Sequence, residues 1–356
     1  MKRAPTPFAN AGIREVPRAS AGRIKSLDAW RFIAVSLVIL SHLLLHSNLS
    51  TLVDAAPYLR RLGRIGALGV EVFFFISGYV ICGGLIRETH ERGKVSLGAF
   101  FVRRAFRILP PLLIYLAVVG FAGLIRPIQL VISALFLCNG ADPEARCSWW
   151  AAHTWSLAYE EQFYLLFPLV FIVFGFAGAR RKPVLIGLAS LIALSLIVRG
   201  VFGGYAADYV FNASFLLVGC VAAMLRIERF RLTGGAWLGL LLGFLIPYML
   251  LPHPLELYAA CVIPIWVFLI VLGAPVQTVA GRRVFENPAL VYIGRMSYSV
   301  YLWQQLATAK WPGMRATFYW PLVGGVFVLA YLSWQWMELP LIRFGRRLSY
   351  EHERHS

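Results

Sequence analysis

Ionisable side chains lie inside long apolar stretches of this sequence. Burying such a group in a membrane costs at least a few kcal/mol, so each one is a functional-site candidate by default. His42 follows Arg31 by eleven residues. In a helix this spacing gives about 16 Å of rise and about 20° of angular drift, so both side chains would face one groove. Glu71 and Glu160 stand at a depth similar to that of His42 in two other stretches, which predicts general acid/base chemistry there.

A second set of ionisable residues is basic and falls toward the opposite end of the expected helices. Its members are Arg31, Arg103, Arg104, Arg107 and Arg295. Arginine binds phosphate oxygens with its planar fork, so this inner belt suits a phosphate-bearing donor. Two simpler interpretations stay open. The arginines at 103–107 could act only as topology signals, and Arg31 could pair with Asp28 or extend to the membrane interface.

The surrounding composition defines the class of protein. The chain has 356 residues, of which 59% are hydrophobic and 14% charged, and its mean hydropathy is +0.69. Soluble globular chains carry about 25% charged residues, so a soluble globular enzyme is excluded. The net charge of +17 comes from basic residues placed between the apolar stretches, and we therefore expect no nucleic-acid partner.

The apolar stretches predict an all-α polytopic membrane protein, a bundle of about ten transmembrane helices. The expected spans are 27–46, 66–86, 108–126, 155–177, 183–199, 209–225, 236–252, 257–273, 290–307 and 317–336. A shorter apolar run at 128–138 is predicted to be re-entrant or interfacial.

The loops between these spans predict the orientation. Lys and Arg favour one set of loops by roughly three to one, which places both termini in the cytoplasm. Residues 1–26 would form a flexible basic cytoplasmic tail, 27–340 the transmembrane domain and 341–356 a second basic cytoplasmic tail. Cys138 and Cys147 would lie on the outer side, where a disulfide between them is possible.

Six segments, in order, resemble the acyltransferase-3 family of membrane proteins, which O-acylate bacterial surface sugars and some secondary metabolites. The segments are LDAWRFIAVSLVILSH (27–42), GVEVFFFISGYVI (69–81), RRAFRILPPLLIY (103–115), HTWSLAYEEQFYLLFP (153–168), IGRMSYSVYLW (293–303) and MELP (337–340). Each alone is a weak signal, but six in consistent order cover almost the whole chain.

The resemblance implies acetyl-CoA or another acyl-CoA as the donor and a bacterial cytoplasmic (inner) membrane as the location. It also implies roles for particular residues. His42 matches the essential histidine with Arg31 as its motif partner, and Glu160 matches the acidic residue, with less weight on Glu71. Arg104 and Arg107 would contact the donor's phosphates. Gln304 departs from the family, because many relatives have histidine there and glutamine can only hydrogen-bond.

These observations predict a multi-pass O-acyltransferase that moves an acyl group, with acetyl the first expectation, from acyl-CoA to a hydroxyl of a sugar or glycan. The acceptor hydroxyl is a poor nucleophile, so a base is needed. We assign that role to His42, with Glu160 orienting it, and a covalent acyl-enzyme at Ser77 stays open. The expected partners are acyl-CoA, a carbohydrate or glycolipid acceptor and the lipid bilayer.

Other interpretations are weaker. No HExxH, paired CxxC or P-loop pattern occurs, so we expect no metal and no ATP. A secondary transporter or exporter of a polar solute is the alternative function, but the two-fold internal repeats typical of transporters are not evident. A structural role in an envelope polysaccharide assembly would not require two charged belts.

Overall fold

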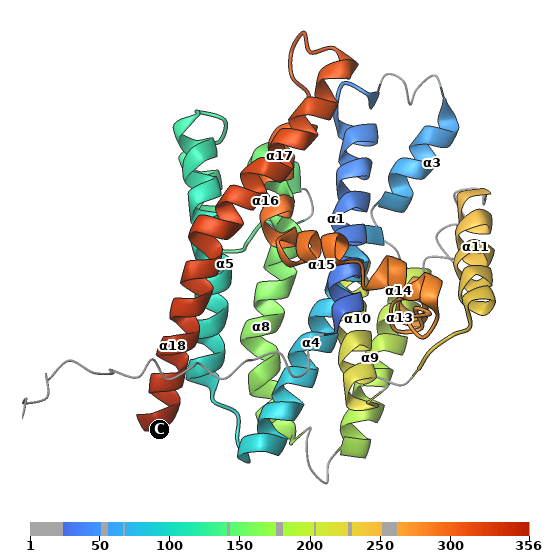
Figure 1. The fold of residues 1–356 in the computed structure, drawn as a ribbon, viewed down its shortest axis with the longest axis vertical. Coiled ribbons are helices and arrows are strands. Elements are labelled where there is room, and N and C mark those ends of the chain that lie inside the picture. The colour runs from blue at the N-terminus through green and yellow to red at the C-terminus, as the bar shows by residue number, and fades with distance from the viewer. Residues whose placement is uncertain are drawn as a thin grey trace, which may run out of the picture.

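The computed structural model describes residues 24–50, 56–66, 68–140, 143–175, 181–202, 204–226, 230–250 and 262–355. These residues form an all-helical protein without strands, and most of the helices run along the long axis of the molecule (Figure 1). Of the predicted tail at 1–26, residues 1–23 lie outside the described residues. The helical fold class is therefore confirmed.

The helices follow one another along the chain with short connections. In order they are α1 (Lys25–His46), α3 (Pro57–Gly66), α4 (Leu68–Arg92), α5 (Leu97–Phe121), α6 (Pro127–Ala134), α7 (Pro143–Ala152), α8 (Thr154–Phe174), α9 (Arg181–Val201), α10 (Gly204–Met224), α11 (Gly234–Leu250), α13 (Ile263–Leu272), α14 (Val279–Phe285), α15 (Pro288–Arg295), α16 (Ser297–Thr308), the 3₁₀ helix η2 (Ala316–Phe318), α17 (Tyr319–Ser333), the π-helix η3 (Trp334–Glu338) and α18 (Leu339–His355).

Six helical segments of the described residues are long and apolar enough to cross a membrane. They are Lys25–His46, Tyr58–Arg92, Leu97–Phe121, Thr154–Phe174, Arg181–Val201 and Ala316–Glu351, and shorter apolar helices span Val210–Met224, Gly234–Leu250 and Ile263–Leu272. Large apolar side chains point outward, including Val173 at 70% and Ile186 at 67% exposure, as lipid-facing positions would. A multi-pass membrane protein is supported, whereas the count of ten spans and the side of the termini stay predictions.

Helix α5 begins earlier than the sequence predicted. We expected a span from residue 108, but α5 begins at Leu97 and is capped by Ser96, whose hydroxyl accepts a hydrogen bond from the Ala99 amide at 3.4 Å. The arginines at 103–107 are therefore inside the helix and not before it. Hydropathy placed them outside because charged residues lower the average of an apolar window.

The predicted span 290–307 is wrong as a single helix. The chain forms α15 and then α16, with a break at Met296, and α15 lies across the bundle (Figure 1). Asn287 caps α15 by accepting hydrogen bonds from the amides of Ala289 and Leu290. Gly294 allows α15 to press against α1, since a Cβ there would overlap the carbonyl oxygen of Asp28.

The C-terminal part of the chain is a nearly continuous helical rod that runs through α17, η3 and α18 (Figure 1). Residues from 341 on, predicted as a basic tail, continue this helix to His355 and pack against α5, where the Phe106 and Phe344 rings lie 5.4 Å apart. Its position on the cytoplasmic side stays a prediction. The rod and α5 together form one wall of the cavity described next.

Candidate active site

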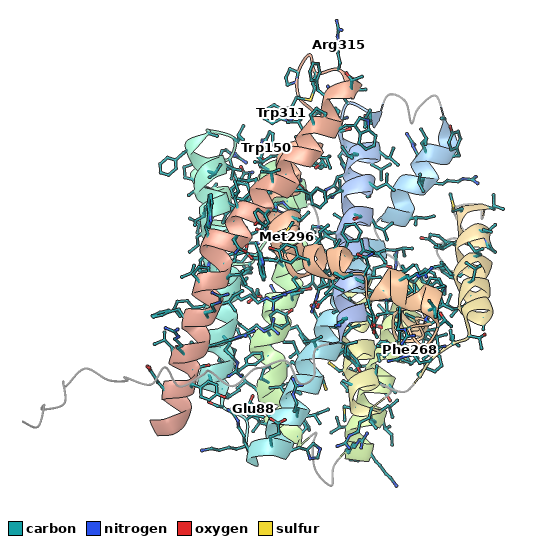
Figure 2. All side chains as sticks on the ribbon, viewed as in Figure 1. Glu88, Trp150, Phe268, Met296, Trp311 and Arg315 are labelled. Carbon is teal, nitrogen blue, oxygen red and sulfur yellow. A yellow bond between two sulfur atoms is a disulfide. The ribbon has the colours of Figure 1, made fainter. Side chains whose placement is uncertain are left out.

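A cavity of about 400 Å³ opens between α4, α5 and α18. We call it the basic cavity, because six arginines line it: Arg87, Arg92, Arg103, Arg104, Arg107 and Arg346. It lies toward the end of the bundle where α18 ends and where Glu88 is labelled, away from the end that carries Trp150 and Trp311 (Figure 2). Arginine-lined cavities of this kind attract phosphates and carboxylates.

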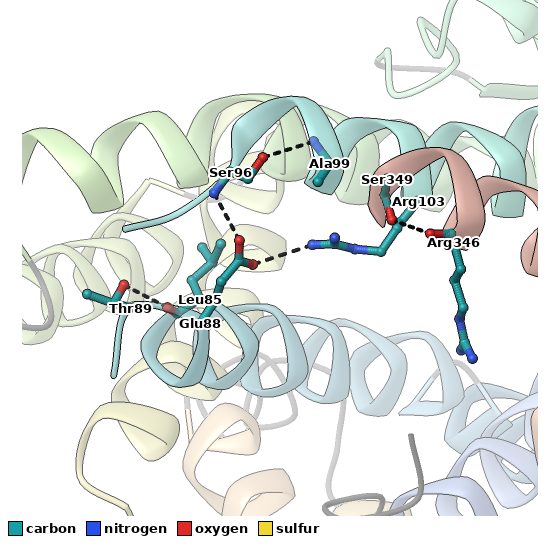
Figure 3. Close-up of polar contacts among 8 residues, drawn as sticks. All are labelled: Leu85, Glu88, Thr89, Ser96, Ala99, Arg103, Arg346 and Ser349. Atoms are coloured by element: carbon teal, nitrogen blue, oxygen red, sulfur yellow. Dashed lines mark hydrogen bonds and ion pairs between the residues drawn. The ribbon is translucent and has the colours of Figure 1, made fainter. Parts of the chain in front are cut away.

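Glu88 organises the wall of the basic cavity. One of its carboxylate oxygens accepts a hydrogen bond from the Ser96 amide at 2.9 Å, and the other pairs with Arg103 Nη2 at 3.4 Å (Figure 3). The same carboxylate therefore ties the start of α5 to α4. Arg346 enters from α18, where its carbonyl accepts a hydrogen bond from Ser349 at 2.8 Å.

A smaller space of about 80 Å³, the central cavity, adjoins the basic cavity between α1, α4, α5, α8 and α16. Arg104 and Arg107 line both spaces, so the two cavities meet at these side chains. The central cavity also receives Arg31, Glu160 and Ser77. The two cavities therefore lie on adjoining sides of the same pair of arginines.

Glu160 is the most highly connected carboxylate of the central cavity. Ser77 donates to its Oε1 at 2.9 Å, while the Tyr164 hydroxyl donates to its Oε2 at 2.9 Å and lies 3.0 Å from Ser77 Oγ. The Arg104 guanidinium stands 4.5 Å from the centre of the Tyr164 ring, and the charges of Arg104 and Arg31 both act on Glu160. Glu160 thus fixes the positions of the Ser77 and Tyr164 hydroxyls in the central cavity.

Arg31 is shared between a structural partner and the cavity. Its Nη1 atom donates to Asp28 Oδ1 at 2.9 Å, and Asp28 is buried under α15. The pairing that the sequence left open is thus present, and Arg31 still lines the central cavity. The buried aspartate holds the arginine toward that space.

His42 lies elsewhere, about three turns further along α1. Its Nδ1 atom is 3.0 Å from Gln304 Oε1, and its ring contacts those of His46 and Trp149 at 5.7 and 5.5 Å between centroids. The expected pairing with Glu160 is therefore wrong, because Gln304 occupies that place and Glu160 has its own partners. His42 is not among the residues that line the two cavities.

Two other predicted site residues also lie apart from the cavity walls. Glu71 is in the first turn of α4, with a buried carboxylate oxygen that has no hydrogen-bond partner among the described residues. The Nε atom of Arg295, at the end of α15, is likewise buried without a partner in that part of the chain. The structure thus gathers Arg31, Arg103, Arg104, Arg107 and Glu160, but not His42, Glu71 and Arg295.

The sequence interpretation missed several polar residues. Tyr164 follows Glu160 by four residues, so helical spacing alone would have placed them on one face. Glu338 of the MELP segment is buried and accepts hydrogen bonds from Ser299 and Ser333. Gln305 contributes to the surroundings of His42 through contacts that no local spacing indicates.

The disulfide that the sequence allowed joins the segment after α6 to α7. Cys138 and Cys147 are bonded to each other. The bond holds α7, from which the Trp149 ring contacts that of His42.

Comparison with known proteins identifies the family to which this site belongs. The family model of the acyltransferase domain Acyl_transf_3 matches residues 24–339. The chain belongs to this acyltransferase family. The resemblance drawn from the six segments is therefore confirmed, and no solved structure matches the chain.

Two relatives from Staphylococcus aureus share part of this sequence. A protein of strain COL, named provisionally as an O-acetyltransferase, is 28% identical over 323 residues, which are 79% of this chain and 50% of that protein. The O-acetyltransferase OatA of strain NCTC 8325 is 33% identical over 190 residues, 45% of this chain and 30% of its own length. The chain spans about half the length of the first of these relatives and less of the other.

Proposed function

We propose that this protein is an integral membrane O-acyltransferase that moves an acyl group, with acetyl the first expectation, from acyl-CoA to a hydroxyl of a sugar or glycan. Family membership supports acyl transfer. The observation that carries the choice of donor is the meeting of the basic and central cavities at Arg104 and Arg107. A coenzyme A thioester has phosphates at one end and its reactive carbon at the end of a thin arm, which matches this arrangement.

In this proposal the donor's phosphates lie in the basic cavity. Arg104 and Arg107 would hold the phosphates nearest the arm, while arginines of α4 and α18 bind those further out. Glu88 neutralises part of the charge of Arg103, so the other arginines of the basic cavity provide most of the attraction for the phosphates. The bacterial cytoplasmic membrane is the proposed location, with this cavity facing the cytoplasm.

The reaction transfers the acyl carbon from sulfur to oxygen. The acceptor oxygen forms a bond to the thioester carbon, the carbon–sulfur bond breaks, and coenzyme A leaves as its thiolate. A base must take the acceptor's proton because an alcohol is a weak nucleophile at neutral pH. His42 is proposed as this base, and Glu160 is proposed to orient groups in the central cavity through Ser77 and Tyr164. The acceptor would approach from the end of the bundle opposite the basic cavity.

The proposed scheme uses no metal. In the described part of the chain no three His, Cys, Asp or Glu side chains gather in one place. The residues named above supply the positive charge, the base and the hydroxyl contacts that a thioester acyl transfer requires.

The proposal is tested by thioester cleavage. Protein purified in detergent is incubated with acetyl-CoA, with and without a glycan acceptor, and the released thiol and acetylated product are measured. We expect acceptor-dependent release of thiol. A transporter of polar solutes would release none in either condition, and this outcome would contradict the proposal.

Arginine variants test the donor site in the same assay. Arg104→Ala should raise the KM for acetyl-CoA more than it lowers kcat, because a phosphate contact exists in the ground state and the transition state alike. Arg104→Lys should give an intermediate KM. The matched control is Arg347→Ala, which removes an exposed arginine of α18 that does not line either cavity. Equal KM values in all three variants would reject the donor-site assignment.

A further inference from the structure

His42 is the end of a buried chain of hydrogen bonds that begins at a backbone carbonyl. Gln305 Nε2 donates to the carbonyl oxygen of Trp149 at 2.7 Å, and Gln304 Nε2 donates to Gln305 Oε1 at 3.0 Å. Gln304 Oε1 then lies 3.0 Å from His42 Nδ1. Both glutamines are 1% exposed, so water does not compete for these amide groups. This chain of hydrogen bonds links α7, α16 and α1.

The carbonyl at the start fixes the direction of every bond in the chain. A backbone carbonyl can only accept, so Gln305 must present its NH₂ group to Trp149 and its oxygen to Gln304. Gln304 must then use its own NH₂ group for Gln305, which leaves its oxygen facing His42. An acceptor opposite Nδ1 requires a hydrogen on Nδ1. The alternative orientation of either amide would set two acceptors or two donors against each other in a buried place, which is costly.

Thr308 is compatible with this orientation. Its hydroxyl, one turn beyond Gln304 on α16, lies 3.1 Å from the Gln304 carbonyl and 3.2 Å from Gln304 Oε1. A hydroxyl can donate to either oxygen, so it adds a donor where the side-chain oxygen accepts. The hydroxyl could also accept from an inverted amide, so the direction of the Gln304 amide is set by its contact with Gln305.

We propose that Gln304 and Gln305 are positioning residues that hold neutral His42 as the Nδ1–H tautomer, which leaves the Nε2 lone pair to take the acceptor's proton. The inference rests on the proposed function for its catalytic meaning. His42 Nε2 makes no hydrogen bond to any described residue, so that nitrogen is available. The amides cannot take up the proton themselves, and they orient the histidine without competing for its role.

The tautomer can be measured directly and without any activity assay. Protein labelled with nitrogen-15 histidine is purified in detergent, and the ring signals of His42 are assigned by their absence from His42→Gln. Protonated and unprotonated ring nitrogens resonate at well-separated frequencies. We expect Nδ1 protonated and Nε2 unprotonated at a pH where His42 is neutral. A wild-type His42 with the hydrogen on Nε2 would overturn the inference.

Variants of the two glutamines test the chain itself. Gln305→Met removes the anchor and lets the Gln304 amide turn, so we expect a mixture of tautomers. In Gln304→Glu the buried acid keeps its proton to donate to Gln305 Oε1, and its other oxygen still accepts from Nδ1, so the Nδ1–H form should persist. The control Gln277→Met removes an amide that donates to the Leu232 carbonyl from an exposed position outside this chain, and it should change nothing. A single unchanged tautomer in Gln305→Met would contradict the role of the anchor.

Kinetics then connect the tautomer to the reaction. Gln304→Met and Gln305→Met should lower kcat by about 10 to 100-fold, as the loss of hydrogen-bond partners of metal-bound histidines does, with the KM for acetyl-CoA unchanged. Gln304→Glu should retain most of kcat, which a role in packing alone would not predict. If wild-type protein shows the expected tautomer but transfers no acyl group, the proposed function fails and the hydrogen-bond chain stands. Equal kcat in wild type and Gln305→Met would overturn the positioning role.

Discussion

His42 and Glu160 have separate partners, and the two groups can therefore be tested independently. His42 lies against Gln304 and Trp149, while Glu160 is bonded to Ser77 and Tyr164 in the central cavity. Arg31 lies on the same helix as His42, about 16 Å away along the helix axis and toward the proposed donor site. A change at His42 should thus affect proton transfer and leave the arginine contacts to the donor in place.

For His42 we expect both His42→Ala and His42→Gln to lower kcat by about 10² to 10⁴-fold, the usual contribution of a general base, while acyl-CoA binds as before. Glutamine keeps a hydrogen-bonding side chain of similar length but has no group that takes a proton. The control is His90→Gln, which alters an exposed histidine that contacts Arg226. The measurement is kcat and donor affinity on monodisperse protein in detergent. Near-normal turnover in His42→Gln would transfer the role of base to Glu160.

At the scale of helices, the sequence predicted where most elements lie but not where charged residues interrupt the pattern. Apolar runs located α1, α4 and α8 within a few residues. The same runs misplaced the start of α5, because a hydropathy window cannot know that Arg104 will be enclosed by Tyr164 and Glu160 from another helix. Tertiary packing decides whether a charged side chain faces protein or lipid.

The break between α15 and α16 has the same kind of cause. A run of apolar residues at 290–307 satisfies a single-helix pattern, and the break lies beside a contact between distant segments, Gly294 against Asp28. The glutamine chain to His42 likewise depends on contacts with Trp149, more than a hundred residues away. Local spacing could have found Tyr164 beside Glu160, but not these contacts.

The contact at Gly294 gives a prediction for α15. In Gly294→Ala the new methyl group would overlap the Asp28 carbonyl, and backbone cannot move aside as a flexible side chain can. We expect a loss of about 1–3 kcal/mol of stability, as overpacking usually causes, together with a raised KM for acyl-CoA because Asp28 holds Arg31. Thermal unfolding followed by size-exclusion chromatography measures the first effect. Gly324→Ala in α17, where nothing lies within 4 Å of the added carbon, is the control and should keep the wild-type Tm.

Over the whole molecule, the arginines and the histidine divide between two ends of one helical bundle. The basic cavity is at the end where α18 finishes and Glu88 is labelled, whereas Trp150 is labelled toward the other end, next in sequence to Trp149, whose ring contacts that of His42. The outward apolar side chains in between suit a lipid environment. Such an arrangement lets a donor and an acceptor enter from opposite faces of a membrane, provided that the orientation is as proposed.

The orientation is predicted from the basic residues, which favour the side that would hold both termini and the basic cavity by roughly three to one. An alkaline phosphatase reporter, active only outside the cytoplasm, should give high activity when fused after residue 145 and low activity after residues 92 and 230. A fluorescent protein that folds only in the cytoplasm should give the reverse pattern at the same three positions. Acyl-CoA is a cytoplasmic metabolite, so its phosphates can reach the arginines only if this pattern holds. High phosphatase activity after residue 92 would place the basic cavity outside the cell and remove the donor from its proposed site, whatever the arginine variants show.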